Sequence, residues 1–229
     1  MFYVETSGSH YEMGAQFGRA TALQIGSMLD YLTKTFRHWD EAKFNRVRRD
    51  HMRYTEKLCP ELIEEIQGIA DGSGFPFRWI YLMNFYSVML AGNQCCTNIV
   101  FPQTPDGPLL GKTNDLPVHE GKHSGVRRFH PAHGAAFLGS GFPGTVWCGC
   151  GVNAAGLAIG GSSCSANVPP PQEALAPHVV NRYALAHAAT VKEAVAVLAT
   201  IAVPRWGMNI ALVDRSGAAA IVEKAGAVQ

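Results

Sequence analysis

The sequence has little net charge and few charged side chains. Of its 229 residues only 16% are charged, and the formal net charge at pH 7 is +1. Nucleic acids and anionic membranes attract proteins with a strongly basic surface, so neither is expected as a partner. One basic run lies between residues 46 and 53, but acidic residues are interspersed with it, which is typical of a solvated helix face.

Long hydrophobic runs are absent as well. No window approaches the roughly 18 to 20 apolar residues that a membrane-spanning helix needs. The first residues also lack the basic flank and apolar run of a signal peptide. The six cysteines are therefore expected to be reduced thiols, and the protein is expected in the cytoplasm. A hydrophobic share of 47% is enough for a large folded core.

Residues 1 to about 92 have the pattern of a helical segment. Apolar and small residues recur at helical spacing from Tyr11 to Leu32. A second helix is expected over Pro60–Ala70, because proline favours the first helical position and Asp71–Gly74 is a stop signal. A third, Trp79–Leu90, is apolar nearly all round, which indicates that it is buried.

From residue 96 the pattern changes to short strands. Thr97–Phe101 and Pro108–Thr113 flank Pro-Gln-Thr-Pro-Asp-Gly, a turn sequence that predicts a hairpin. The other predicted elements are strands over Ala135–Ser140, Thr145–Val152, Gly156–Ser162, Met208–Val213 and Ala218–Glu223, and helices over Ala174–Ala189 and Val191–Ile201. Strands, then helices, then strands predict a layered α+β fold.

Two adjacent cysteines, Cys95 and Cys96, mark the junction between the halves, and a strand is expected to begin on the second. A thiol is a strong nucleophile even when only partly ionised. A free α-amino group titrates near pKa ~7.7–8.0, so the amine of an N-terminal cysteine can act as a general base near neutral pH. That amine becomes free only when the Cys95–Cys96 peptide bond is cut.

The segment Asn93–Leu116 resembles the start of the catalytic chain in the penicillin acyltransferase family. These are acyl-CoA:6-aminopenicillanate acyltransferase-like, autoproteolytic N-terminal-nucleophile cysteine hydrolases. The shared features are Cys-Thr opening a strand and Gly-basic-x-x-Asp on the second strand of a hairpin. The Gly-Ser-x-Tyr-Glu-x-Gly stretch at Gly8–Gly14 is similar to the family's leader, and Gly151–Ala158 resembles its Gly-x-Asn-x-x-Gly-Leu-Ala hairpin. Bile-salt and penicillin V hydrolases share the cysteine motif but begin almost at the nucleophile, so a helical leader favours the acyltransferases.

The resemblance implies a four-layer αββα N-terminal-nucleophile fold, with residues 1–95 as a helical prosegment and residues 96–229 as the catalytic portion. It implies self-processing between Cys95 and Cys96, followed by acyl transfer or hydrolysis at a linear amide through a thioester on Cys96. The substrate would be a small-molecule amide or acyl donor, acyl-CoA among them. The cleaved prosegment would be a partner, and neither a cofactor nor a metal is implied.

The resemblance also implies roles for four other residues. Asp115 would orient the Cys96 amine or thiol, because Cys96 begins one strand of the hairpin and Asp115 ends the other. A shift of one residue in register would turn Asp115 away. Lys112 falls where relatives often carry arginine and is expected to hold charge near the site. Gly161 and Ser162 lie in the stretch that supplies oxyanion contacts in relatives, here through backbone N–H groups.

Three features depart from the family pattern. Position 95 is cysteine where relatives usually have glycine or another residue, and position 113 is threonine where asparagine is common. The family's Thr-Asn-His segment, whose asparagine helps stabilise the oxyanion, is expected a little beyond Gln229. The sequence is therefore expected to be either a fragment or a naturally shortened relative, with a catalytic portion that lacks its C-terminal part.

A zinc-dependent hydrolase is the alternative from another class. His119-Glu120-Gly121-Lys122-His123 matches H-E-x-x-H, which binds zinc when a helix brings both imidazoles to one face. Pro117, Gly121 and Gly125 argue against a helix there, so the match is interpreted as fortuitous. A catalytically inactive relative or fragment is the third hypothesis.

Overall fold

A computed structural model describes residues 1–35, 41–89, 95–116, 118–164, 166, 173–203 and 207–226. Its strands are β1 (Phe2–Gly8), β2 (Cys95–Phe101), β3 (Leu109–Asp115), β4 (Gly125–Pro131), β5 (Phe137–Gly141), β6 (Cys150–Asn153), β7 (Ala158–Cys164), β8 (Gly207–Val213) and β9 (Ala219–Lys224). Its helices are α1 (His10–Thr35), α2 (Glu41–Leu58), α3 (Pro60–Ser73), α4 (Phe77–Met89), α5 (Val118–Gly121), α6 (Pro177–His187) and α7 (Val191–Ala199).

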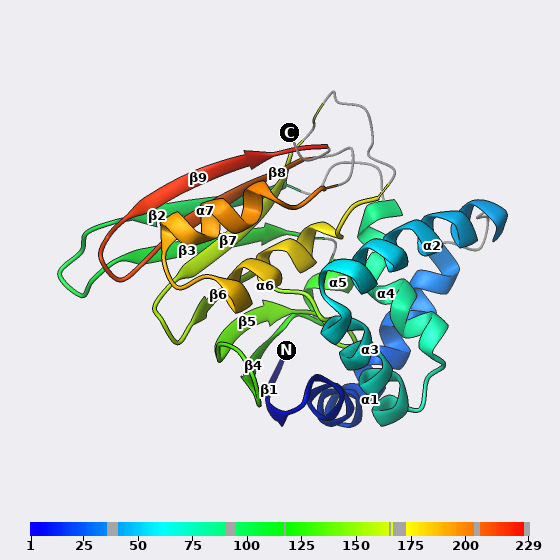
Figure 1. Cartoon of the computed structure of the whole chain (residues 1–229). Helices are drawn as coiled ribbons and strands as arrows, with labels where there is room; N and C mark the ends of the chain where they lie inside the picture. The colour runs from blue at the N-terminus through cyan, green and yellow to red at the C-terminus, as the bar shows by residue number, and fades with distance from the viewer. Residues whose placement is uncertain are drawn as a thin grey trace.

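The described strands form a large sheet and a separate hairpin (Figure 1). The seven strands of the sheet follow the order β1-β4-β5-β6-β7-β8-β9, and β2 pairs with β3 alone. Adjacent residues of β7 show that the hairpin and α6 cover opposite faces of the sheet. A Cβ on Gly160 would lie 2.6 Å from the Asn98 side chain of the hairpin, whereas one on Gly161 would lie 2.5 Å from Asn181 of α6. Glycine at both positions permits this close approach.

The N-terminal residues are built into this fold at two places. Strand β1 pairs in parallel with β4 at the edge of the sheet, so the opening residues form a strand where a helix was expected. Helices α1 and α3 pack backbone against backbone, because a Cβ on Gly14 would lie 2.1 Å from the Glu65 carbonyl oxygen and one on Gly68 equally close to that of Tyr11. The N-terminal residues are thus an integral part of the structure.

A buried ion network joins the leader to the sheet. Glu65 of α3 is fully buried and accepts hydrogen bonds from Arg127 Nη1 of β4 at 2.7 Å and from Arg182 Nη2 of α6 at 2.5 Å. His10 Nδ1 lies 3.1 Å from the same carboxylate. Burial alone would raise the pKa of Glu65, but the charges of Arg182 and Arg127 outweigh it and hold that pKa well below its usual range.

Most elements that were predicted from the sequence are confirmed within a few residues of their expected bounds. The predicted mixed α+β class is confirmed as well. The hairpin, α3 with its left-handed Gly74 cap, α6, α7, β8 and β9 lie where they were expected. Strand β4 was not predicted. The predicted strand Thr145–Val152 is wrong in its first half, because β6 begins only at Cys150. The full four-layer sandwich stays a prediction.

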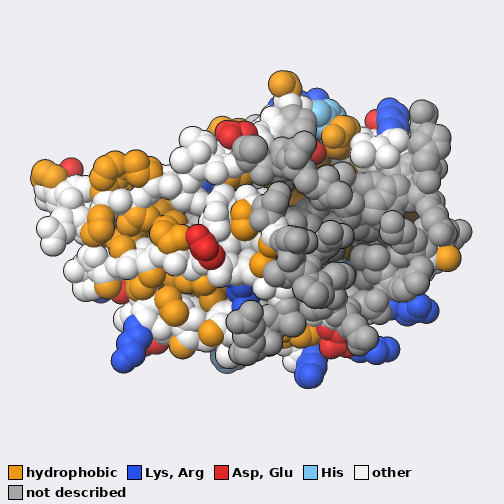
Figure 2. All heavy atoms as spheres, turned by 90° about the horizontal axis from the view of Figure 1, so that it is seen from above, with side chains coloured by type: hydrophobic (Ala, Val, Ile, Leu, Met, Phe, Trp, Pro, Cys, Tyr) orange, Lys and Arg blue, Asp and Glu red, His pale blue; other side chains and the backbone are white. Residues whose placement is uncertain are grey.

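The surface agrees with the balanced charge of the sequence. Figure 2 views the molecule from above relative to Figure 1. It shows hydrophobic side chains gathered over the strand-rich end of that face, with Lys and Arg scattered along the edges. Ile99, Phe101 and Leu109 of the hairpin and Ile221 of β9 are among the exposed hydrophobic residues. In the described part of the chain, no helix is both long enough and apolar enough to cross a membrane. The cytoplasmic location stays a prediction.

Candidate active site

Cys96 lies at the start of the β2–β3 hairpin. The turn that joins the strands closes with a hydrogen bond from the Gly107 N–H to the Thr104 carbonyl oxygen, at 3.1 Å, and Gly107 supplies the positive φ of 99°. This register sets Cys96 opposite Asn114. The Cys96 thiol is free and half-buried, and its Sγ lies 3.8 Å from Asn114 Oδ1. A thiol and an exposed amide therefore share one face of the hairpin at its open end.

The hairpin register sets Asn114, and not Asp115, opposite Cys96, so the expected contact between Asp115 and the Cys96 thiol stays a prediction. In the hairpin Asp115 pairs with Cys95, one position away from the Cys96–Asn114 pair. Side chains alternate between the two faces of a strand, so Asp115 is on the face opposite Asn114. Asp115 is exposed. A catalytic role for Asp115 stays a prediction that none of its described contacts supports.

A small cavity of about 40 Å³ opens beside Cys96. Its polar lining also includes Asn114 of β3, Glu120 of α5, Ser124 of the loop before β4, Ser140 of β5 and His178 of α6. Trp147, whose ring centroid lies 4.6 Å from that of His178, closes the cavity with Phe142. A water molecule occupies about 30 Å³ in the liquid, so the cavity has room for one.

His178 is the residue of this cavity whose ionisation is most altered. Burial, and then the positive charge of Lys112, lower the pKa of His178 to about 4. The imidazole is therefore neutral at physiological pH and cannot form an ion pair with a thiolate. Its position is fixed by the ring of Trp147 and by a hydrogen bond of 3.1 Å from the Cys148 N–H to the His178 carbonyl oxygen.

Lys112 and Gly161 lie together in the structure, but both already have hydrogen-bond partners within the protein. Lys112 Nζ donates a hydrogen bond to the Gly161 carbonyl oxygen. The Gly161 N–H donates to the Gly149 carbonyl oxygen at 3.1 Å, so it is not open to an oxyanion as it stands. The Ser162 hydroxyl donates to the Asn209 carbonyl oxygen at 3.3 Å. Of the three predicted substrate-binding residues, Lys112 has the clearest effect near Cys96, through the charge that it sets beside His178.

The H-E-x-x-H segment does form a helical turn, which corrects the sequence interpretation. Lys122 N–H bonds to the Val118 carbonyl oxygen at 3.2 Å, so Gly121 does not prevent helix α5. The His119 ring stacks on Tyr31, and His123 Nε2 lies 3.2 Å from Ser27 Oγ. Within the described ranges no group of three His, Cys, Asp or Glu side chains is arranged to hold a metal ion.

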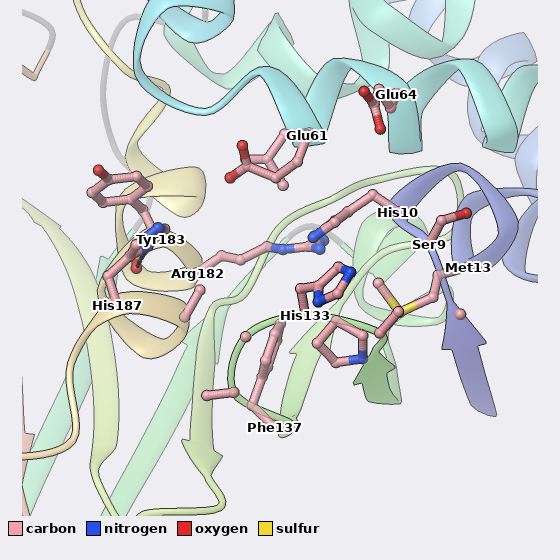
Figure 3. Close-up of a pocket in the computed structure, with 17 residues that line it drawn as sticks. Ser9, His10, Met13, Glu61, Glu64, His133, Phe137, Arg182, Tyr183 and His187 are labelled. Atoms are coloured by element: carbon pink, nitrogen blue, oxygen red, sulfur yellow. Dashed lines mark hydrogen bonds between the residues drawn. The ribbon is translucent and has the colours of Figure 1, made fainter.

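A second, larger cavity of about 490 Å³ lies between residues from the two halves of the chain (Figure 3). The N-terminal half contributes Ser9, His10, Met13, Glu61 and Glu64, and the C-terminal half contributes His133, Phe137, Arg182, Tyr183 and His187. It shares no lining residue with the cavity beside Cys96. Its volume is in the range of small-molecule sites.

Asn114, Glu120, Ser140 and His178 were not predicted from the sequence to lie beside Cys96. Asn114 could have been found from strand alternation, since the residue that pairs with Cys96 has its side chain on the same face of the hairpin. The other three come from separate strands and helices, and only the folded chain brings them to Cys96. No local pattern in the sequence indicates such an assembly.

The structure defines a mixed α+β protein with a half-buried thiol beside a small cavity at the start of a hairpin. A family model described as acyl-coenzyme A:6-aminopenicillanic acid acyl-transferase matches residues 103–226, more than half of the chain. The chain belongs to this family, as the sequence motifs predicted, and membership supports an enzyme that acts as an acyltransferase or hydrolase. No curated protein matches the chain.

Proposed function

We propose that the protein is a self-processing N-terminal-nucleophile enzyme whose nucleophile is the Cys96 thiol. The observation that carries the proposal is the position of this thiol, half-buried at the start of β2 beside Asn114 and a cavity lined by polar groups. Family membership supports it, although the matched region begins at residue 103, beyond the cysteine. In this proposal residues 1–95 are the leader and residues 96–229 the catalytic portion.

Self-processing would be an intramolecular acyl shift followed by hydrolysis. The Cys96 sulfur attacks the carbonyl carbon of Cys95, the C–N bond to Cys96 breaks, and the Cys96 nitrogen takes up the proton that the thiol loses. Water then cleaves the thioester, which leaves a carboxylate on Cys95 and restores the thiol. The product carries a free α-amino group on Cys96, which can act as a base in later turnovers.

The mature enzyme would transfer or hydrolyse acyl groups through the same sulfur. The thiol attacks the carbonyl of a small amide or acyl donor, of which the family's description names acyl-coenzyme A, and the leaving group departs with a proton from the Cys96 amine. Water or a second amine then takes the acyl group from the thioester. None of these steps involves a metal ion, in contrast to the zinc alternative.

Trapping the thioester tests this proposal. Hydroxylamine attacks thioesters and releases the acyl group as a hydroxamate, which mass spectrometry detects. The protein is incubated with an acyl-coenzyme A, denatured in acid and separated from the unreacted probe, which is itself a thioester. Hydroxylamine treatment of the washed protein should then yield the hydroxamate from the wild type and none from Cys96→Ala, while Cys95→Ala should behave like the wild type. A hydroxamate from Cys96→Ala but none from Cys95→Ala would move the nucleophile to the neighbouring thiol, and none from any form would contradict the proposal.

A further inference from the structure

Self-cleavage in the single chain lacks the base that serves the mature enzyme. Before cleavage the Cys96 nitrogen is an amide, and an amide does not accept a proton at neutral pH. The departing nitrogen also needs a proton, because an amine leaves far more readily than its anion. A group beside Cys96 that can both take a proton and give it back would meet the two requirements.

His178 has the position for this transfer. It lines the same cavity of about 40 Å³ as Cys96, and Trp147 and the Cys148 N–H hold it in place. Among the described residues, Glu120 of α5 lines the same cavity and Lys112 of β3 sets a positive charge near the imidazole, while Cys148 directs its own thiol to the Cys150 carbonyl oxygen at 3.2 Å. A single water can fit between an imidazole and a thiol that share a cavity of this size.

We infer that His178 accepts the Cys96 thiol proton during self-cleavage, directly or through one water, and returns it to the departing Cys96 nitrogen. The inference rests on the proposed function. The S–C bond to the Cys95 carbonyl forms as the C–N bond breaks, and the proton passes from sulfur to imidazole to nitrogen, so the imidazole ends neutral as it began.

The electrostatics of the cavity suit the second half of this transfer. Burial and the Lys112 charge, which lower the pKa of His178 to about 4, make the protonated imidazole a stronger acid than usual. It therefore gives its proton readily to the departing nitrogen. Glu120 is the competing candidate, since it lines the same cavity, but its Oε1 already lies 3.4 Å from the Tyr31 hydroxyl.

The rate of self-cleavage in freshly translated protein tests the inference. A cell-free translation pulse gives the uncleaved chain, and gel electrophoresis follows its conversion to residues 1–95 and 96–229. His178→Gln should slow the conversion about 100-fold or more, in line with the usual contribution of general acid–base catalysis. His133→Gln is the matched control, because His133 is exposed on the β4–β5 loop, and it should leave the rate unchanged.

Two further readouts separate a proton-transfer role from a structural one. Added imidazole should restore much of the lost rate to His178→Gly. The wild-type rate should be level from pH 5 to 8, because His178 stays unprotonated there, whereas the rate of His178→Gln should rise with pH, because hydroxide then has to replace the missing base.

Equal rates and pH profiles for His178→Gln and the wild type would overturn the inference and leave the proposed function standing. Loss of cleavage in Glu120→Gln with none in His178→Gln would assign the base to Glu120 instead. A wild-type chain that never cleaves at Cys96 would contradict the proposed function itself, and this inference with it.

Discussion

Asn114 Oδ1 lies 3.8 Å from Cys96 Sγ, across one pair of facing residues in the β2–β3 hairpin. An amide in this position can accept the thiol proton in a hydrogen bond and so orient the sulfur. A hydrogen bond of this kind contributes about 1 kcal/mol, or about a fivefold change in rate. Asn114→Ala should therefore slow self-cleavage about fivefold.

Asp115→Asn is the matched comparison for Asn114→Ala, since Asp115 is the next residue and is on the opposite face of the hairpin. The same gel assay measures both variants. Asp115→Asn should have the smaller effect. A larger effect for Asp115→Asn would mean that the carboxylate reaches the reacting atoms in a register or conformation other than the one described above.

Replacing Glu65 should destabilise the fold strongly. Glu65→Gln removes the charge that both buried arginines share, and breaking a buried ion pair costs about 3–5 kcal/mol. Urea unfolding in a Cys96→Ala background, which should keep the chain intact, measures the loss. Glu64→Gln is the control, because that exposed neighbour should change the free energy of unfolding by no more than about 0.5 kcal/mol. Equal losses for the two variants would show that the buried network contributes little.

The contribution of Glu65 to stability should depend on pH. Its pKa is lowered in the folded state, because the charges of Arg182 and Arg127 outweigh the effect of burial. A lowered pKa gives stability that is complete above the unfolded-state value, about 4.3 for glutamate, and that is lost as the pH falls below it. The difference in unfolding free energy between the parent and Glu65→Gln should be constant from pH 8 to 6 and shrink below about pH 4.5. A difference that grows on acidification would contradict this assignment.

The ionisation of His178 can be observed directly. In an NMR titration of the Cys96→Ala protein, the His178 ring signals should not move between pH 8 and 5.5, because its pKa is lowered to about 4. Lys112→Met removes one of the two causes, so the His178 pKa should rise toward the ordinary value of about 6.5. An unchanged midpoint in Lys112→Met would show that the lysine charge does not reach the imidazole.

Much of the fold could be predicted from the sequence because its signals are local. Pro60 and Gly74 bound α3, and the turn that ends at Gly107 defines the hairpin. The pairing register of that hairpin could not be predicted as securely. A shift of one residue decides whether Asn114 or Asp115 is on the same face as the thiol. Strand β4 was missed even though it supplies Arg127 to the buried network.

The candidate site was predictable only in part. Cys96 stands out in the sequence because helices give way to strands at that residue. His178 and Glu120 do not, because they reach the cavity from α6 and α5 through tertiary packing that no local spacing records.

Sequencing the N-terminus of the purified full-length protein tests most directly whether Cys96 becomes the nucleophile of a cleaved chain. Two sequences are expected in equal amounts, one starting at Met1 and one at Cys96. Cys96→Ala should give Met1 alone. A wild-type protein that gives only the Met1 sequence, on a chain of undiminished mass, would contradict the account.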